Sequence, residues 1–478
     1  MNLNKITPVL MAAAIMLFIA GCKTPSLTKS PSAKAMPADF SSGLDSNLNS
    51  GVLTWRQFFK DPYLAALIDT ALLHNQELAI MRQEIEIASN DIRYQKSRLY
   101  PKAEAGLGVG IEKVGRYTSQ GAGDASTEIT PGKEVPDWLM DYRFGAVATW
   151  EADIWKKLRN SKKIAVNRYL STMEGRNFQT TNLVSEIAGM YYELLALDNQ
   201  LSIVRQTIIL QQNALEIVRA QKEAAAATDL AVKKFESEVL NSQSREYEIL
   251  QKIQIKENDL NQALGRYPQH ILRDTSGILN IAPTLVNAGI PSQLLNNRPD
   301  IKQAVLELES SKLDVKVAKA EFYPAFNITA ALGFQAFNPN YLVKFPESLL
   351  SSLAGDLAGP LINKAAIKTE YANANARQIQ AIYEYERTIL NAYIEVSSGL
   401  SNMQNYEQIF NRKAAETDTL TSSVNIANDL FRSARADYLE VLMTQRDALE
   451  TKLELVEIRL SQHLAATGLY RALGGGWN

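Results

Sequence analysis

Hydrophobic and polar positions alternate strictly in residues 100–111, YPKAEAGLGVGI, unlike most of the chain. One side of this stretch carries apolar or small side chains, at Ala103, Ala105, Leu107, Val109 and Ile111. The other side carries glutamate and glycine, at Glu104, Gly106, Gly108 and Gly110. A period of two predicts a β-strand with two different faces. Because a lone strand leaves its backbone donors and acceptors unpaired, the pattern also predicts partner strands.

The same alternation returns in residues 321–334, EFYPAFNITAALGF, where the Tyr-Pro pair recurs 223 residues after the first one. Each copy is followed by a second candidate strand, YRFGAVATW at 142–150 and LLSSLAGDLAG at 349–359. The connections between the paired candidates are polar and are expected to be exposed loops. The pattern therefore predicts two β-hairpins, at about 102–151 and about 325–360, and four strands in all.

Apolar residues spaced by three and four dominate the rest of the chain. Between Leu183 and Val218, ten of eleven such positions are apolar, which is a sustained heptad seam. Helices are also expected at 62–98 and 299–321, before the hairpins, and from about 363 to 425. The fold class predicted is mainly α with a small β part. A helix of about 60 residues spans roughly 90 Å, so the molecule should be elongated.

The two copies predict an internal two-fold repeat. The first repeat covers 52–265 and contains a helix, a hairpin and a long antiparallel helical hairpin of coiled-coil type. The second repeat covers 299–478, follows the same plan and adds a C-terminal tail. Residues 266–298 connect them as a linker or equatorial segment.

The N-terminal residues have the pattern of an export signal. Lys5 precedes an apolar stretch at 9–20, and IAGC ends at Cys22, the only cysteine in 478 residues. Small residues before a lone cysteine resemble the bacterial lipobox, although Ile19 stands where leucine is more frequent. The interpretation is a lipoprotein signal peptide at 1–21, lipid attachment at Cys22 and a flexible tether at 22–51. An ordinary secretory signal with an incidental cysteine is the alternative.

Composition narrows the function classes. The net charge is only −2, so nothing suggests a nucleic-acid partner. No segment after the signal has eighteen consecutive apolar residues, so no transmembrane helix is expected. The three histidines are far apart in sequence, and neither HExxH nor CxxC spacing occurs. No enzymatic activity, cofactor or metal site is predicted.

Four strands with one apolar face predict an oligomer. Bacterial single-chain barrels have at least about eight strands, and an open sheet in lipid leaves costly unpaired edges. Three copies would provide about twelve strands and a water-filled lumen. The apolar face would contact lipid, and the glycine and glutamate face would line the lumen. Two or four copies would also close a barrel, so the strand count alone does not fix three.

Four stretches resemble motifs of the TolC-like outer-membrane efflux proteins, most closely the lipidated branch that serves proton-driven RND-type pumps. They occur in the family order and span the chain from about residue 52 to its end: WRQFFKDPYLAALI at 55–68, WEADIWKKLR at 150–159, GIPSQLLNNRPDI at 289–301 and LYRALGGGW at 469–477.

This resemblance implies a homotrimer with a shared twelve-stranded transmembrane β-barrel and a long periplasmic α-barrel that tapers at its tip. It implies a location in the cell outer membrane, lipid-anchored, with helices in the periplasm. The implied function is an exit duct that passively conducts drugs, toxic compounds or metal ions. Its implied partners are a periplasmic adaptor, an inner-membrane RND-type pump and outer-membrane lipid. The alternatives are a type I protein secretion channel and a lipid-anchored periplasmic coiled-coil adaptor or scaffold.

The resemblance also points to a candidate periplasmic aperture in residues 434–446, ARADYLEVLMTQR. The related pattern is approximately Gly-x-x-Asp-Tyr-Leu-x-Val-Leu-Asp-Ala-Gln-Arg, and its later aspartate helps to line the closed tip. Here Met443 replaces that aspartate, while Asp437 and Glu440 remain acidic. The hypothesis is that Glu440, supported by Arg446 or Arg435, forms the constriction and that Met443 forms an apolar collar. The alternative is that Glu440 is an ordinary solvated helix charge.

Overall fold

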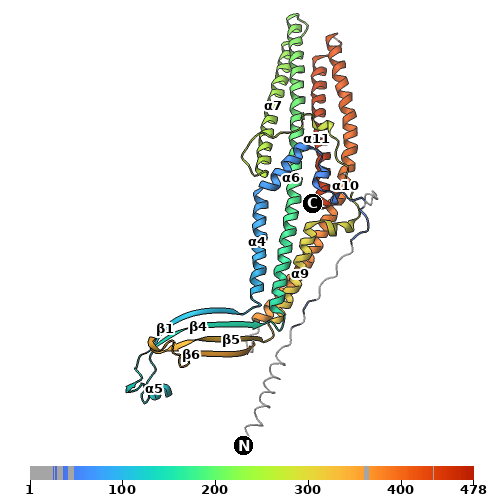
Figure 1. The fold of residues 1–478 in the computed structure, drawn as a ribbon. Helices are drawn as coiled ribbons and strands as arrows, with labels where there is room; N and C mark the ends of the chain where they lie inside the picture. The colour runs from blue at the N-terminus through green and yellow to red at the C-terminus, as the bar shows by residue number, and fades with distance from the viewer. Residues whose placement is uncertain are drawn as a thin grey trace. The chain divides into compact units, whose positions relative to one another are not determined.

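The computed structural model of the protein describes residues 25, 27–28, 36–40, 48–359, 365–433 and 435–477 (Figure 1). Cys22 and the predicted signal peptide lie outside the described residues. The chain divides into two compact units, each made of separate stretches. One unit comprises Met1–Pro31, Ile87–Tyr169 and Glu307–Ile382, and the other comprises Ser32–Glu86, Leu170–Leu306 and Tyr383–Asn478. The predicted fold class, mainly helical with a small β part, is confirmed.

The first unit contains a four-stranded antiparallel sheet with the order β1-β4-β5-β6 (Figure 1). Its strands are β1 (Lys102–Glu112), β4 (Leu139–Ala152), β5 (Ala325–Ala336) and β6 (Leu349–Ala358). β1 with β4 and β5 with β6 are the two predicted hairpins. β4 pairs with β5 over eleven registered residues and so joins the hairpins. The predicted partner strands are thus present, and the two halves of the chain share one sheet.

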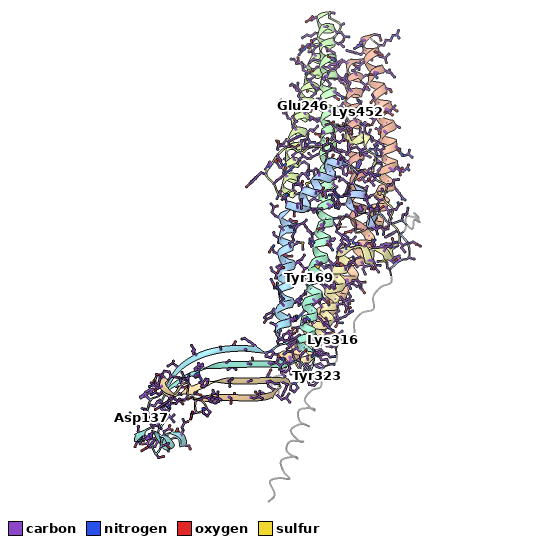
Figure 2. All side chains as sticks on the ribbon, in the orientation of Figure 1. Asp137, Tyr169, Glu246, Lys316, Tyr323 and Lys452 are labelled. Carbon is purple, nitrogen blue, oxygen red and sulfur yellow. The ribbon has the colours of Figure 1, made fainter. Side chains whose placement is uncertain are left out.

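The connection between β1 and β4, expected to be a loop, has secondary structure of its own. It contains α5 (Ser119–Asp124) and a small hairpin of β2 (Glu128–Thr130) and β3 (Lys133–Glu134). Asp137, labelled in Figure 2, lies 3.6 Å from the Lys113 amino group. The shorter connection between β5 and β6 holds one 3₁₀ turn, η4 (Pro339–Tyr341).

Long helices make up most of the remaining chain: α3 (Pro62–His74), α4 (Gln76–Ser97), α6 (Lys157–Glu223), α7 (Asp229–Ala263), α9 (Pro299–Ala320), α10 (Ala365–Arg432) and α11 (Tyr438–Ala472). Short helical turns lie between them: η1 (Ser50–Val52), α2 (Trp55–Phe58), η2 (Ile278–Asn280), η3 (Pro291–Gln293) and α8 (Leu294–Asn297). Within the described residues, no helix combines the length and apolar composition that crossing a bilayer requires.

The single helix expected at 62–98 is wrong, because the chain breaks it at Asn75. Asn75 has extended backbone angles, φ −62° and ψ 128°, and ends α3. Its side-chain oxygen accepts a hydrogen bond from the Leu78 amide, and its amide group donates to the Ala263 carbonyl. These bonds satisfy groups that a helix interruption otherwise leaves unpaired.

Local sequence signals explain the other helix ends. Asp61 caps α3 ahead of Pro62, and Thr228 caps α7 through the Ala231 amide. The predicted start of α9 at Pro299 is confirmed. Glycine ends α11, since Gly474 has φ +86° and its amide donates to the Arg471 carbonyl.

The core of the second unit is aromatic and aliphatic. Phe58 and Tyr470 stack with ring centroids 4.0 Å apart, and both side chains are almost fully buried. The Tyr470 hydroxyl donates to the Leu53 carbonyl, so burial leaves no unpaired hydroxyl. Part of the expected tether packs here too, because Phe40 is buried and stacks on Tyr393 of α10. These residues are held in place rather than solvated.

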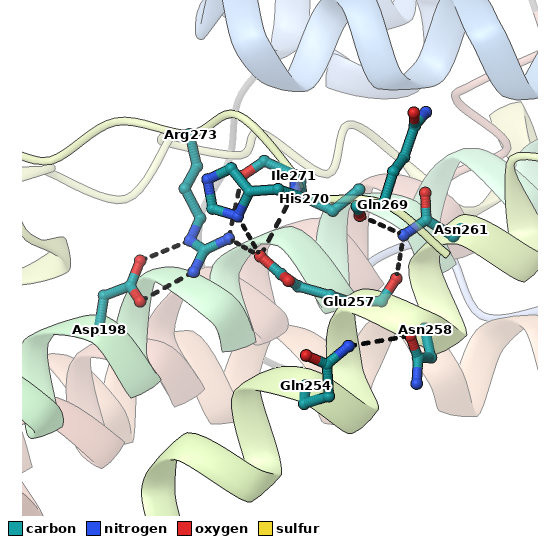
Figure 3. A network of polar contacts seen from close by, with 9 residues as sticks. All are labelled: Asp198, Gln254, Glu257, Asn258, Asn261, Gln269, His270, Ile271 and Arg273. Carbon is teal, nitrogen blue, oxygen red and sulfur yellow. Dashed lines mark hydrogen bonds and ion pairs between the residues drawn. The ribbon is translucent and has the colours of Figure 1, made fainter. Parts of the chain in front are cut away.

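A polar network fixes the start of the linker in this unit (Figure 3). The Arg273 guanidinium donates to Asp198 of α6 and to the nearly buried Glu257 of α7. Glu257 also lies 3.0 Å from Nδ1 of His270. The Asn261 side chain donates to the Gln269 carbonyl at 2.7 Å. Residues 266–273 are therefore attached to both helices by charge-assisted bonds.

Candidate channel surfaces and helix tips

The strand register collects the apolar positions of all four strands on one face of the sheet. One row runs across it from Leu107 through Phe144 and Phe334 to Leu349. The two phenylalanines stack with ring centroids 5.2 Å apart. Leu107 is 89% exposed, and the face continues with further exposed leucines, Leu332, Leu353 and Leu357. An apolar surface of this kind requires an apolar environment or a partner.

The opposite face carries mostly polar side chains and glycines, with Val147, Ala331 and Leu350 among them. It carries Glu104, Gly106, Gly108, Arg143, Gly145, Thr149, Asn327, Thr329, Gly333, Gln335 and Asp356. On this face Lys102 pairs with Glu104, and the Gln335 amide donates to Asp141 at 2.8 Å. The two faces predicted for residues 100–111 are thus confirmed for β1 and continue over most of the sheet.

The edges of the sheet are open in the described chain. β1 pairs only with β4, and β6 pairs only with β5. Each edge strand therefore presents a row of backbone amides and carbonyls without a strand partner. In lipid, each such group would cost several kcal/mol.

Aromatic side chains mark the end of the sheet where its strands join helices. Trp155, just after β4, stacks on Tyr323 with ring centroids 4.6 Å apart; Figure 2 labels Tyr323. The Trp155 indole donates to the Pro324 carbonyl at 2.8 Å. Lys157 pairs with Glu151 at 2.8 Å beside them. Tryptophan and tyrosine are typical of the boundary between a membrane and water.

At the α10–α11 turn, the structure places the predicted aperture residues on one exposed side. Asp437 is the N-cap of α11, and its carboxylate accepts from the Tyr438 amide. Glu440, Met443 and Arg446 are exposed, while Val441 and Leu442 of the same turns are buried. Ala434, which stands where the related pattern has glycine, lies outside the described residues.

The charges at the two helix turns are arranged differently. At the α6–α7 turn, Arg219 bonds to Glu236 at 2.8 Å, Lys233 bonds to the same carboxylate, and Lys222 pairs with Asp229. At the α10–α11 turn, no ion pair joins Glu440 to Arg435 or Arg446 among the described residues. Arg435, Glu440 and Arg446 are all exposed at the second turn.

No group of three or more histidine, cysteine, aspartate or glutamate side chains in the described residues could hold a metal ion. His74 ends α3 and His270 contacts Glu257. His463 is buried in the core of the second unit and stacks on Tyr192 at 4.4 Å. His463 is thus a packed helix histidine.

Protonation of His463 should destabilise the protein. Burial lowers its pKa from 6.5 to about 4, and Nε2 of the neutral ring donates to the Ile281 carbonyl at 3.2 Å. Because the pKa of His463 is depressed in the folded state, the contribution of its neutral ring to stability is fully present above pH 6.5 and is lost as the pH falls toward 4. The loss is up to about 3 kcal/mol. Thermal unfolding between pH 7.5 and 4.5 should show a smaller decrease in Tm for His463→Phe than for the wild type. Equal decreases would contradict a role for His463.

Comparison with known proteins decides the family. The family model described as "Outer membrane efflux protein" matches residues 67–266 and 290–475, which is most of the chain. The chain belongs to the outer membrane efflux protein family. Its activity is efflux at the outer membrane, and this family is one of channels rather than of enzymes.

Individual relatives are distant but nearly full-length. The pyoverdine export outer membrane protein OpmQ of Pseudomonas aeruginosa is 26% identical to this chain. The match covers 90% of this chain and 88% of OpmQ. The probable outer membrane lipoprotein SilC of Salmonella typhimurium is 25% identical, covering 98% of each chain.

Solved structures of efflux channels share the fold. The crystal structure of CusC superposes with a TM-score of 0.81 at 22% identity, covering 95% of this chain and 99% of that one. The open state of MtrE from Neisseria gonorrhoeae gives a TM-score of 0.82 at 18% identity, covering 96% and 99%. Together with the family match, this confirms the resemblance to TolC-like outer-membrane efflux proteins.

Sequence reasoning missed features that depend on distant contacts. Arg298 was expected only beside a helix start, yet it is buried and bonds to Asp300, Glu395 and the Ala472 carbonyl. The position of Arg143 over Gly108 was also missed. The sequence shows a glycine in one strand of the first hairpin and an arginine in the other, but only the strand register shows that they lie opposite each other.

Proposed function

We propose that the protein is the outer-membrane exit duct of a tripartite efflux system and acts as a homotrimer. The observation that carries this proposal is the four-stranded sheet with one apolar face, one polar face and two open edges. In three copies, β6 of one protomer would pair with β1 of the next and close a barrel of about twelve strands. The apolar face would contact lipid, and the polar face would line a water-filled lumen.

The internal repeat proposed from the sequence is supported by element lengths. α6 and α10 have 67 and 68 residues, and α7 and α11 have 35 each. Each long pair follows one β-hairpin. We assign the first repeat to 52–265, the linker to 266–298 and the second repeat to 299–478. Three copies of these helical hairpins would form the periplasmic α-barrel.

The cargo of the duct is proposed as small molecules or ions delivered by an inner-membrane RND-type pump through a periplasmic adaptor. The relatives are named for different cargoes: pyoverdine for OpmQ, toluene for TtgI of Pseudomonas putida, and cations for CusC of Escherichia coli. This variety fits a wide lumen that conducts passively, with selection made mainly by the pump. The chain would be anchored in the outer membrane by lipid at Cys22.

Planar-bilayer recording of the purified full-length protein tests this function. Ion-conducting channels are expected, with native mass spectrometry showing three chains. A protein that inserts without conductance would defeat the duct. A stoichiometry of two or four would defeat only the trimer.

Lipidation at Cys22 is testable on its own. The IAGC sequence predicts that this cysteine carries the lipid. Cys22→Ala behind the same signal should lose incorporation of labelled fatty acid. Leu107 and its neighbours on the apolar face should still support membrane insertion. Labelling that persists in the variant, or an unmodified Cys22 in mass spectra of the wild type, would contradict the assignment.

The aperture proposal places Glu440 and Met443 around the threefold axis, with Asp437 and Arg446 nearby on α11. Glu440→Gln should lower cation preference by about twofold or more, because carboxylate rings attract cations. Met443→Asp should raise cation preference by adding a second ring. Reversal potentials in a salt gradient measure both effects, and Glu416→Gln on α10, paired with Lys413, is the control. Unchanged selectivity in both variants, with intact trimers, would remove these residues from the aperture.

A further inference from the structure

Three glycines lie side by side on the polar face of the sheet. The register aligns Gly106 of β1, Gly145 of β4 and Gly333 of β5, and Leu350 of β6 completes the row. No side chain therefore covers the backbone along this row on three neighbouring strands. On this mainly polar face, the row leaves an area of bare main chain.

The central glycines sit where the sheet bends toward its polar face. A Cβ on Gly145 would lie 2.7 Å from the Leu332 carbonyl oxygen, and one on Gly333 would lie 2.5 Å from that of Phe144. β4 and β5 thus converge on the side where these side chains would point. A glycine pair permits such curvature in a sheet. The polar face is accordingly concave, and Gly106 differs because a Cβ there would meet nothing within 4 Å.

A hollow of about 440 Å³ lies over this glycine row. The polar-face side chains around it are Glu104, Arg143, Val147, Ala331 and Leu350. The residues that alternate with these along each strand point to the other face, so only their main chain faces the hollow. Val147 and Leu350 are 43% and 47% exposed, so the walls offer accessible apolar surface.

Arg143 stands at one end of the hollow and lies across Gly108. A Cβ on Gly108 would be 2.7 Å from the Arg143 Nε, so glycine at 108 is what leaves room for the guanidinium. Arg143 has no ion pair in the described residues. Glu104, the carboxylate that lines the hollow, pairs with Lys102, whereas Asp141 accepts a hydrogen bond from Gln335 and does not line the hollow. Among the side chains that line the hollow, Arg143 is therefore the cation at one end, and the one carboxylate, Glu104, already has a cationic partner.

We infer that this hollow is a transit subsite for organic anions with an apolar body, such as aromatic carboxylates or sulfonates. The anionic group would bond to Arg143, which presents planar donors. The apolar body would lie over the glycine backbone between Val147 and Leu350. The inference rests on the proposed channel, in which three such hollows face the lumen. It adds a preference for anions within a duct that otherwise selects weakly.

The test measures block of potassium current through the full-length channel by two probes with the same ring and opposite charge. Naphthalene-1-sulfonate should block at several-fold lower concentration than 1-naphthylmethylammonium. Arg143→Gln should weaken block by the sulfonate by about fivefold and leave block by the ammonium unchanged or stronger. Gly106→Leu should weaken block by both probes, because it places a side chain in the hollow at a position where a Cβ has no atom within 4 Å.

Lys133→Gln is the matched control, since it removes an exposed cation from β3 outside the main sheet. It should leave both blocking concentrations unchanged. Equal block of the wild type by both probes would overturn the subsite while leaving the duct intact. Unchanged sulfonate block in Arg143→Gln trimers would overturn it as well. A wild-type protein without conductance would instead defeat the proposed function.

Discussion

Leu332→Asp is expected to reduce the amount of assembled protein in the outer membrane by at least fivefold. Leu332 is 61% exposed on the apolar face of β5. Its neighbours across the sheet are Ala146 of β4 and, beyond it, Ala105 of β1. In the proposed barrel this side chain contacts lipid. Basic residues near the middle of the bilayer cost about 2–4 kcal/mol, and acidic residues cost less. We expect about 1–3 kcal/mol per protomer, repeated in each copy. Heat-resistant oligomer on semi-native gels measures the effect, and Leu107→Asp should behave similarly.

Thr329→Asp is the matched control, because it places the same charge on the other face of the same strand. Thr329 pairs with Thr149 on the polar face, which would be wetted by the lumen. Its oligomer yield should stay within about twofold of the wild type, and Glu104→Lys on β1 should be tolerated in the same way. Equal losses for Leu332→Asp and Thr329→Asp would show that the two faces are not distinguished by lipid and water.

The faces of the strands could be predicted because a period of two is a local signal. Alternation in residues 100–111 and 325–334 was enough to assign Leu107 and Leu332 to one face, and the register places them on it. The interruption of the first helix could not be predicted in this way. Asn75 ends α3 because its side chain bonds to Leu78 and to the carbonyl of Ala263, which is 188 residues away. Only the folded chain brings that carbonyl close.

The candidate sites also differ in whether local sequence or distant contacts determine them. The motif at residues 434–446 located an exposed helix start, yet the chain alone does not show what Glu440 and Met443 meet. Their environment would be formed by other copies, which one sequence does not describe. Arg143 illustrates the opposite case, since its single-chain surroundings are informative but depend on register with Gly108.

Arg298 lies in a motif that the sequence explains only as the start of a helix, yet its side chain holds distant parts of the second unit together. Its guanidinium forms a two-bond contact with Asp300, with distances of 3.0 and 2.7 Å. It also donates to Glu395 of α10 at 2.7 Å and to the Ala472 carbonyl at the end of α11 at 2.9 Å. The residue is only 5% exposed. Three helices therefore depend on one buried cation.

Arg298→Ala is expected to lower the free energy of unfolding by about 3–5 kcal/mol, because breaking a buried pair leaves an uncompensated charge on Asp300. Arg298→Lys should lose less, since it keeps the charge but cannot reproduce the two-bond contact. Thermal unfolding in detergent, followed by circular dichroism, measures both. Arg387→Ala is the control, because Arg387 pairs with Glu384 on the exposed side of α10 and should cost less than about 1 kcal/mol. Equal small losses for Arg298→Ala and Arg387→Ala would mean that the buried contacts do not stabilise the junction of α9, α10 and α11.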